Sequence, residues 1–334
     1  MGPVAGGVRR RGRLGEGRLG YPLGGREEGS RGALLHGYQQ VFPTLKDVDV
    51  EAYLETVRLR GDTPWEHLRH LHQCLLDLNE SLAAWRREAT AAPLAERRRQ
   101  IARRIRHCWR RKRPDADGQY RLVIDSERID SLPVLPEAIT FEHVSQVSIR
   151  RAHLHTITPG FLQRFTQIQA LDLSENLLGG IPDGLQALTQ LTTLSLARNQ
   201  VVIDEAGLAR LAALQRLRTL DLSYNPIALL PPLGSLLNLQ RLSLRSTGLT
   251  ELPVEVYMHP TLEDIDLRDN RVEDMSPTLA PSHRRLAGLS LHDNAMPDEP
   301  QHALRETLGA QGAAMLPVRR HGPGGQESLE RWLD

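Results

Sequence analysis

The chain has 334 residues, enough for one large domain or two modest domains that each bury a hydrophobic core. Its 42 Lys and Arg residues nearly balance 41 Asp and Glu residues, and the net charge of +1 excludes an overall field that would attract nucleic acid or an anionic membrane. Two cysteines, Cys74 and Cys108, are too few for a disulfide framework, and neither lies in a Cys-x-x-Cys pair.

The first segment, residues 1–36, is rich in Gly and Arg and has no apolar run long enough for a signal-peptide core or a membrane span. Such a composition buries too little apolar surface to offset the chain entropy lost on folding. We therefore expect this segment to be disordered, and we expect no membrane partner.

Residues 37–116 are predicted to form a small α-helical domain. A first helix begins near Asp47 and ends at Gly61, which supplies the left-handed conformation common at helix ends. The sequence Thr-Pro-Trp-Glu from Thr63 onward is a capping box and starts a second helix. The leucines of this helix follow three- and four-residue spacing, which places them on one face. A third helix is expected at about 94–112.

From residue 117 to residue 297 a different pattern recurs, LxxLxLxxNxL, with a period of 22 to 26 residues. One imperfect copy precedes seven others, which start at Val144, Ile168, Leu191, Leu217, Leu239, Leu262 and Leu286. The two leucines of LxL point to one side of a short strand, and no single strand can bury that side alone. Repeats of this length are leucine-rich repeats. The sequence therefore predicts an α/β leucine-rich-repeat solenoid, a right-handed horseshoe with about eight short parallel strands on its concave face, after the α-helical domain.

An asparagine at the turn of most repeats is expected to satisfy backbone groups that face inward. These residues are Asn176, Asn199, Asn225, Asn270 and Asn294. Glu127, Ala152 and Thr247 replace it in three repeats, where the bonding must be made differently. After the repeats, residues 298–334 are predicted to form a capping helix followed by a Gly- and Pro-containing linker.

Two groups of residues suggest other kinds of site. Histidines and cysteines on the second and third helices could approach a metal, but their spacing matches no standard zinc module, so we expect no metal site. The third helix carries ten Lys or Arg residues between Arg97 and Arg113. A basic helix can hold phosphates, yet only Trp109 is available for stacking, so nucleic acid is the disfavoured alternative.

No catalytic motif is visible in the sequence. It contains no GxSxG, no P-loop, no HExxH and no paired catalytic carboxylates. Cys74 is followed by Leu-Leu-Asp and Cys108 by Trp-Arg-Arg, so we expect neither to have the acidic or histidine partner that a thiolate nucleophile needs close by. We expect no cofactor.

The concave face is the surface left for recognition, because its outward positions can vary without disturbing the core. We expect a protein partner to contact Arg150, Asp172, Glu175, Ser195, Arg198, Asp221, Tyr224, Arg241, Arg245, Asp264, Asp266, Arg268 and His292. Tyr224, central and aromatic, is the expected anchor. One alternative stays open, in which Arg241 and Arg245 simply pair across strands with Asp264 and Asp266.

A helical segment with Trp85 and the Arg-rich CWRR, followed by repeats containing AGLARLAALQRLRTLDLSYNP and LRSTGLTELP, resembles a known bacterial group. This group is the NEL-type ubiquitin-ligase effectors, which are leucine-rich-repeat proteins, and the resemblance covers roughly residues 37–334. It implies that the array selects host substrate proteins or occludes the ligase, and that a helical domain with a Cys-x-Asp nucleophile follows. No Cys-x-Asp occurs in this chain.

Two functions from different classes stay open. The first, implied by the resemblance, is a protein-binding module: the substrate-recognition part of a secreted effector in the host cytoplasm, without its catalytic domain. The second is a free-standing repeat scaffold in the bacterial cytoplasm with no tie to ubiquitin. On either hypothesis this chain is not expected to be an enzyme.

Overall fold

The computed structural model describes residues 31–112, 114–227, 230, 233–251, 256, 259–273 and 288–294. The predictions for residues 1–30 and 298–334 lie outside these ranges. The described residues fall into two compact units, one with 31–40 and 45–70, the other with 41–44 and those from 71 onward. The sequence predicts that the helical domain ends at residue 116, whereas the two compact units divide between residues 70 and 71, inside the helix Pro64–Arg87.

The first unit contains helix α1 (Arg31–Val41) up to Gln40, helix α2 (Asp47–Leu59) and the start of α3 (Pro64–Arg87). Helix α2 ends before Gly61, whose φ is +87°, as predicted. The predicted N-cap contact of Thr63 is present, because its hydroxyl accepts from the backbone N–H of Glu66 at 3.4 Å. The Tyr38 hydroxyl donates to the Pro64 carbonyl at 2.9 Å.

Helix α1 corrects the prediction that disorder extends to residue 36. Leu34, Tyr38 and Val41 recur at spacings of four and three, and all three are buried. This spacing gives an apolar face that stabilises a helix. The Gly- and Arg-rich composition of the neighbouring residues obscured the signal.

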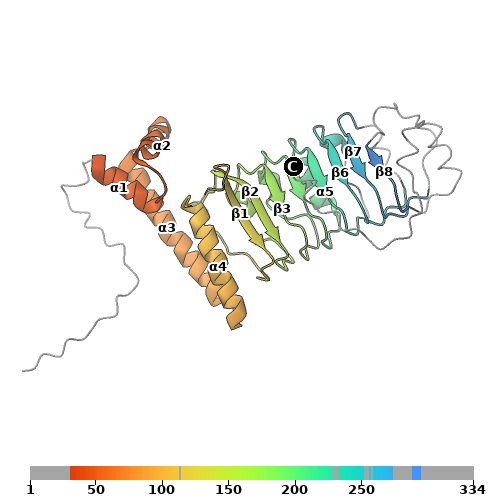
Figure 1. Cartoon of the computed structure of the whole chain (residues 1–334), viewed down its shortest axis with the longest axis horizontal. Coiled ribbons are helices and arrows are strands. Elements are labelled where there is room, and N and C mark those ends of the chain that lie inside the picture. The colour runs from red at the N-terminus through yellow and green to blue at the C-terminus, as the bar shows by residue number, and fades with distance from the viewer. Residues whose placement is uncertain are drawn as a thin grey trace, which may run out of the picture. The chain divides into compact units, whose positions relative to one another are not determined.

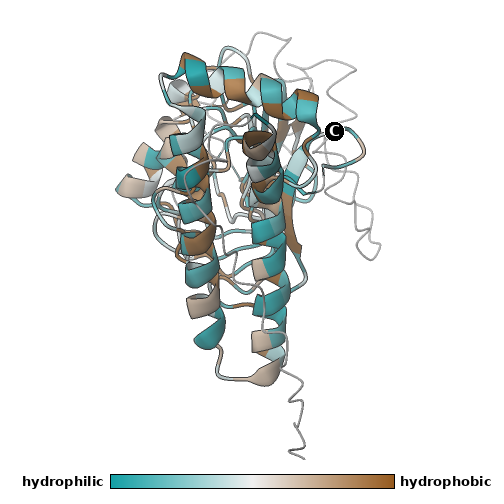
Figure 2. Ribbon diagram, turned by 90° about the vertical axis from the view of Figure 1, so that its left-hand side faces the viewer, coloured by the Kyte–Doolittle hydropathy of each residue, from teal (hydrophilic) through white to brown (hydrophobic). Residues whose placement is uncertain are grey.

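In the second unit, helix α4 (Ala92–Trp109) packs against the first strand of the repeats. Arg98 of this helix is buried, and it donates to the Trp85 carbonyl at 2.7 Å and to the Ser131 hydroxyl at 2.8 Å. Trp85 donates to the same hydroxyl at 3.3 Å. Helix α4 and the C-terminal half of α3 lie side by side (Figures 1 and 2) and together cap the apolar end of the solenoid, which is why they belong with the repeats.

The repeats form one open, all-parallel sheet whose eight strands follow chain order (Figure 1), as predicted. The strands are β1 (Tyr120–Asp125), β2 (Val144–Arg150), β3 (Ala170–Asp172), β4 (Thr193–Ser195), β5 (Thr219–Asp221), β6 (Arg241–Ser243), β7 (Asp264–Asp266) and β8 (Leu289–Ser290). The connections include helix α5 (Glu205–Ala212) and 3-10 turns η1 (Leu162–Arg164), η2 (Leu185–Ala187) and η3 (Leu233–Ser235). The LxL leucines are buried between the strands and these connections.

The predicted role of the turn asparagines is confirmed. Asn225 donates to the carbonyls of Leu196 at 2.9 Å and Leu222 at 3.0 Å, and its side-chain oxygen accepts from the Val201 N–H at 2.9 Å. Asn176, Asn199, Asn270 and Asn294 make the corresponding bonds. Thr247, which replaces one asparagine, donates to the Leu244 carbonyl at 2.8 Å. Each amide therefore joins neighbouring coils.

A second column of residues, one position before the asparagines, is left-handed. The φ angles lie between 51° and 61° at Ser126, Arg151, Glu175, Arg198, Tyr224, Ser246, Asp269 and Asp293. The N–H groups in this column extend the sheet, as when Tyr224 donates to the Arg245 carbonyl at 2.8 Å. The column places a row of charged and aromatic side chains where the strands end.

Candidate functional site

The central row of the concave face alternates serine and aspartate across seven strands. Directly paired from β2 to β8, these residues are Ser148, Asp172, Ser195, Asp221, Ser243, Asp266 and Ser290. Four of them were predicted to contact a partner, but Asp172, Ser195, Asp221 and Asp266 are only 4 to 6% exposed. Their side chains are enclosed by their neighbours, so they offer a partner little surface.

The three aspartates of this row have a structural task. Each carboxylate accepts the backbone N–H two residues ahead, as in the bond from Ser223 to Asp221 at 3.0 Å. Arg150 lies 3.6 Å from Asp172, and Arg268 lies 2.8 Å from Asp266. Asp221 forms no ion pair within the described ranges, and burial, followed by repulsion from the other two carboxylates, raises its pKa.

The first repeats neutralise their own charges where the strands end. Arg150 pairs with Glu175 at 2.8 Å, and Arg151 pairs with Asp125 at 2.8 Å. Arg151 also lies 3.9 Å from Glu175, which links the two pairs. Arg150 and Glu175 are therefore held by each other, and a partner would have to break this network to use them.

Where the middle strands β4, β5 and β6 end, an aromatic ring lies between charged groups. The guanidinium of Arg198 lies 4.0 Å from the centre of the Tyr224 ring, and that of Arg245 lies 5.7 Å from it. Arg245 pairs with Asp269 at 2.5 Å, whereas Arg198 is exposed and has no carboxylate partner in the described part of the chain. We call Arg198, Tyr224 and Arg245 the edge site.

A shallow hollow of about 460 Å³ adjoins the edge site. It is lined by Tyr224, Asn225, Pro226, Ser246, Thr247, Gly248, Asp269 and Arg271. Its walls come from three consecutive turns, where Tyr224, Ser246 and Asp269 are left-handed. The edge site therefore combines an aromatic ring, a free cation and a depression beside them, which is what a protein anchor needs.

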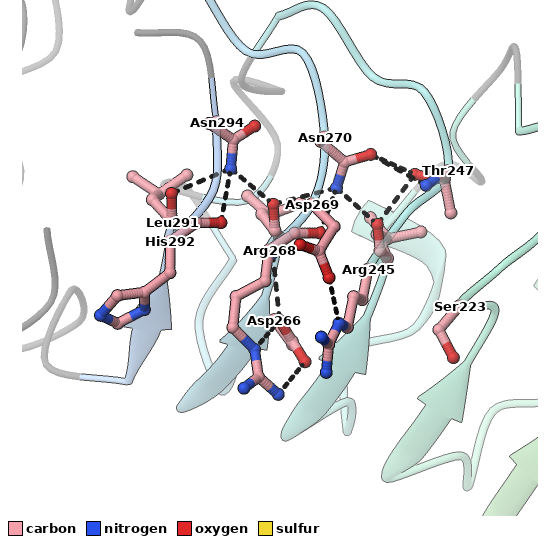
Figure 3. A network of polar contacts seen from close by, with 12 residues as sticks. Ser223, Arg245, Thr247, Asp266, Arg268, Asp269, Asn270, Leu291, His292 and Asn294 are labelled. Carbon is pink, nitrogen blue, oxygen red and sulfur yellow. Dashed lines mark hydrogen bonds and ion pairs between the residues drawn. The ribbon is translucent and has the colours of Figure 1, made fainter. Parts of the chain in front are cut away.

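The last repeats show which cross-strand pairs form (Figure 3). Arg268 binds Asp266 of its own strand end through two nitrogen atoms, at 2.9 and 2.8 Å. The alternative in which Arg245 pairs with Asp264 or Asp266 is thus wrong, because Asp269 is its partner. Arg241 is exposed and forms no ion pair with any described residue, and Asp264 and His292 are half-buried. The pairing with Asp269 was missed because the left-handed turn that presents it is not visible in the sequence.

The basic helix α4 uses most of its arginines within the fold. Arg97 donates to the Arg128 carbonyl at 2.8 Å, and Arg106 donates to the Asn79 side chain at 3.1 Å. Arg110 donates to the Val41 carbonyl at 2.9 Å, and Arg104 pairs with Glu127. These bonds hold the guanidinium groups against the protein and occupy some of their donors, which argues against the nucleic-acid alternative.

The two cysteines are poor nucleophiles in this setting. Cys74 is buried and donates to the Ala138 carbonyl at 3.7 Å, and burial raises the pKa of its thiol. Burial raises the pKa of Cys108 to about 12. Both thiols are therefore protonated at neutral pH. Among the described residues, no three His, Cys, Asp or Glu side chains come together as metal ligands, and no helix is long and apolar enough to cross a membrane.

Comparison with known proteins identifies the repeats. Residues 142–201 and 216–236 match family models described as leucine rich repeat. The chain is 30% identical over 118 residues to the probable inactive serine/threonine-protein kinase roco10 of Dictyostelium discoideum. It is 28% identical over 180 residues to Podocan-like protein 1 of Mus musculus. These matches cover 35 and 47% of this chain but only 4 and 31% of those proteins.

A solved Shigella effector LRR domain has the same fold. The match has a TM-score of 0.51 at 20% identity and covers 69% of this chain and 90% of that one. At this identity the likeness supports the fold alone. The predicted solenoid is thus confirmed, while membership of the NEL-type effector group stays a prediction.

Proposed function

We propose that this leucine-rich-repeat protein is an interaction module that anchors a protein partner at the edge site of its concave sheet. The observation that carries the proposal is the position of Tyr224 between Arg198 and Arg245. Tyrosine and arginine are the side chains most often found at energetic centres of interfaces. The repeats supply the rigid frame that such a centre needs.

The edge site is ordered before a partner arrives. Arg245 is held by Asp269, and the Tyr224 ring is held between the guanidinium groups of Arg198 and Arg245. Binding therefore costs little side-chain entropy at these two residues. Arg198 has its positive charge available for a carboxylate or for a carbonyl of the partner.

Replacing Arg198 and Tyr224 together with alanine should weaken partner binding by about 3 kcal/mol, roughly a hundredfold in Kd. A photo-reactive residue at Ser246, in the adjoining hollow, would capture the partner, and mass spectrometry would compare yields between the two forms. The control carries Gln186→Ala and Leu237→Ala, which change two exposed residues outside the strands. Equal capture by the edge-site variant would show that another surface binds the partner.

In the finer form of the proposal, the partner is a host protein, and this chain is the recognition part of a secreted effector without its own catalytic cysteine. The resemblance to the NEL-type group supports this form, as do the protonated thiols of Cys74 and Cys108. The competing form is a scaffold that stays in the bacterial cytoplasm. The fold is compatible with both.

A secretion assay separates the two forms. For an effector, a reporter enzyme fused to the C-terminus of the full chain should enter host cells from a bacterium with an active injection system. The same fusion in a strain with a disabled injection system is the control. Retention in both strains would favour the scaffold. Transfer of ubiquitin to Cys74 or Cys108 from a charged conjugating enzyme would contradict both forms.

A further inference from the structure

A second hollow, of about 500 Å³, lies where β3, β4 and β5 begin. We call it the lower hollow, and it is lined by Gln169, Gln190, Thr192, Arg216, Arg218 and Asn238. All six side chains are polar, two are cationic, and none is a carboxylate. The hollow is therefore rich in hydrogen-bond donors and positively charged.

The repeat geometry brings these residues together. Gln169, Thr192 and Arg218 each directly precede a strand, and their backbones stack from one coil to the next. The Thr192 N–H donates to the Gln169 carbonyl at 2.8 Å, and the Arg218 N–H donates to the Thr192 carbonyl at 2.8 Å. Adjacent coils of a sheet lie about 4.8 Å apart, so side chains from three coils can reach one ligand.

Most of the surrounding side chains are held in place by the protein itself. Arg216 donates to the side-chain oxygen of Gln190, and Asn238 donates to the Gln215 carbonyl at 2.8 Å. The Thr192 hydroxyl donates to the Gln169 carbonyl at 3.0 Å. The Gln190 amide nitrogen and the Arg218 guanidinium have no partner in the described residues. Both can donate to a ligand without breaking an existing bond.

Charge compensation differs along the solenoid. Five arginines of the sheet and its ends have a carboxylate within 4 Å, namely Arg121, Arg150, Arg151, Arg245 and Arg268. Within the described ranges, Arg198, Arg216, Arg218 and Arg241 have none. Arg241 begins the next strand, and its N–H donates to the Arg218 carbonyl at 2.9 Å. Three of these four unpaired arginines, Arg216, Arg218 and Arg241, thus lie where β5 and β6 begin.

We infer that the lower hollow binds carboxylate side chains from an acidic segment of the protein partner. The inference rests on the proposed function, because it assumes a protein on the sheet, and it adds the chemistry of that protein and a second contact. Arg218 and Arg216 receive the carboxylates, since guanidinium groups bind them through paired hydrogen bonds. The amide of Gln190 completes the donor set.

The test uses the full chain and a fluorescein-labelled peptide of about ten glutamates, with binding followed by fluorescence anisotropy at low salt. Changing both Arg216→Gln and Arg218→Gln should weaken binding about tenfold, because two guanidinium contacts are lost. The matched control, Arg86→Gln with Arg103→Gln, removes the same charge from exposed positions of α3 and α4 and should change binding less than twofold. Circular dichroism checks that each variant is folded.

Three outcomes would overturn the inference. Equal weakening in both double variants would show that binding follows net charge and not the hollow. Complete displacement of the peptide by millimolar inorganic phosphate would point to a small-anion site. Tighter, hollow-dependent binding of a single-stranded RNA of similar length would point to nucleic acid.

The two proposals can fail separately. In one outcome, capture from Ser246 depends on Arg198 and Tyr224, but the Arg216 and Arg218 variant binds the peptide as tightly as the native chain. This result would support the edge site and contradict the inference about the lower hollow. In the other outcome, the peptide binds through the lower hollow, but the edge-site variant captures as much protein as the native chain. This result would contradict the proposed anchor at the edge site and support the acidic contact.

Discussion

Replacing Asn225 with alanine is expected to lower the free energy of unfolding by about 3 kcal/mol, because several buried hydrogen bonds are lost at once. Asn225 is 2% exposed, and its amide serves the Leu196 and Leu222 carbonyls and the Val201 N–H. In the alanine variant these backbone groups stay buried without a partner. Urea unfolding of the full chain, followed by circular dichroism, would measure the loss.

Two further variants define the mechanism. Asn238 is exposed and donates to the Gln215 carbonyl, so Asn238→Ala should change stability by less than about 0.5 kcal/mol. Asn225→Thr should be intermediate, because Thr247 shows that a hydroxyl can serve one carbonyl at this position. If Asn225→Ala and Asn238→Ala had equal effects, the asparagine ladder would not hold the coils together.

Acidification is expected to destabilise the protein through His143. The side chain lies 2.8 Å from the Cys108 carbonyl, and burial, followed by the positive charge of Arg111, lowers its pKa to about 4. Between pH 6.5 and pH 4 the unfolded chain binds a proton at this position and the folded chain does not, so stability falls as the pH falls. The full difference amounts to about 3 kcal/mol.

The His143→Gln variant isolates this contribution. Glutamine keeps an N–H that can donate to the Cys108 carbonyl and removes the titrating ring, although it also loses the ring contacts with Tyr120 and Phe141. Its unfolding free energy, measured at several pH values from 7 to 4, should fall less steeply than that of the native chain. Parallel curves would mean that carboxylates elsewhere account for the acid sensitivity.

Much of the fold follows from local signals. The spacing of the LxL leucines predicted eight parallel strands, and Gly61 and Thr63 marked helix ends correctly. These signals suffice because a side chain on a strand or helix faces a direction set by its position in the period. Helix α1 was missed because its three buried apolar residues, Leu34, Tyr38 and Val41, follow a long run of Gly and Arg.

The site depended on longer-range geometry. Tyr224 was predicted as the central anchor of the concave face, and that role stays a prediction; its two arginine neighbours come from adjacent coils. Asp172, Asp221 and Asp266 were expected to face a partner, and they turn back to their own loops instead. The two-residue period of a strand predicts which side of the sheet a residue faces. It does not predict whether the neighbouring coils enclose a short side chain on that side.

The sequence by itself determined the solenoid, its eight strands and its asparagine ladder, because each depends on a pattern that recurs from coil to coil and needs only contacts between neighbours. The tertiary structure alone decided which charges are neutralised. Arg245 meets Asp269, Arg268 meets Asp266, and Arg218 meets no carboxylate among the described residues. The physical reason is that the partner of a long side chain depends on the distance between coils and on the left-handed turns. Neither of these can be predicted from the spacing of residues in the sequence.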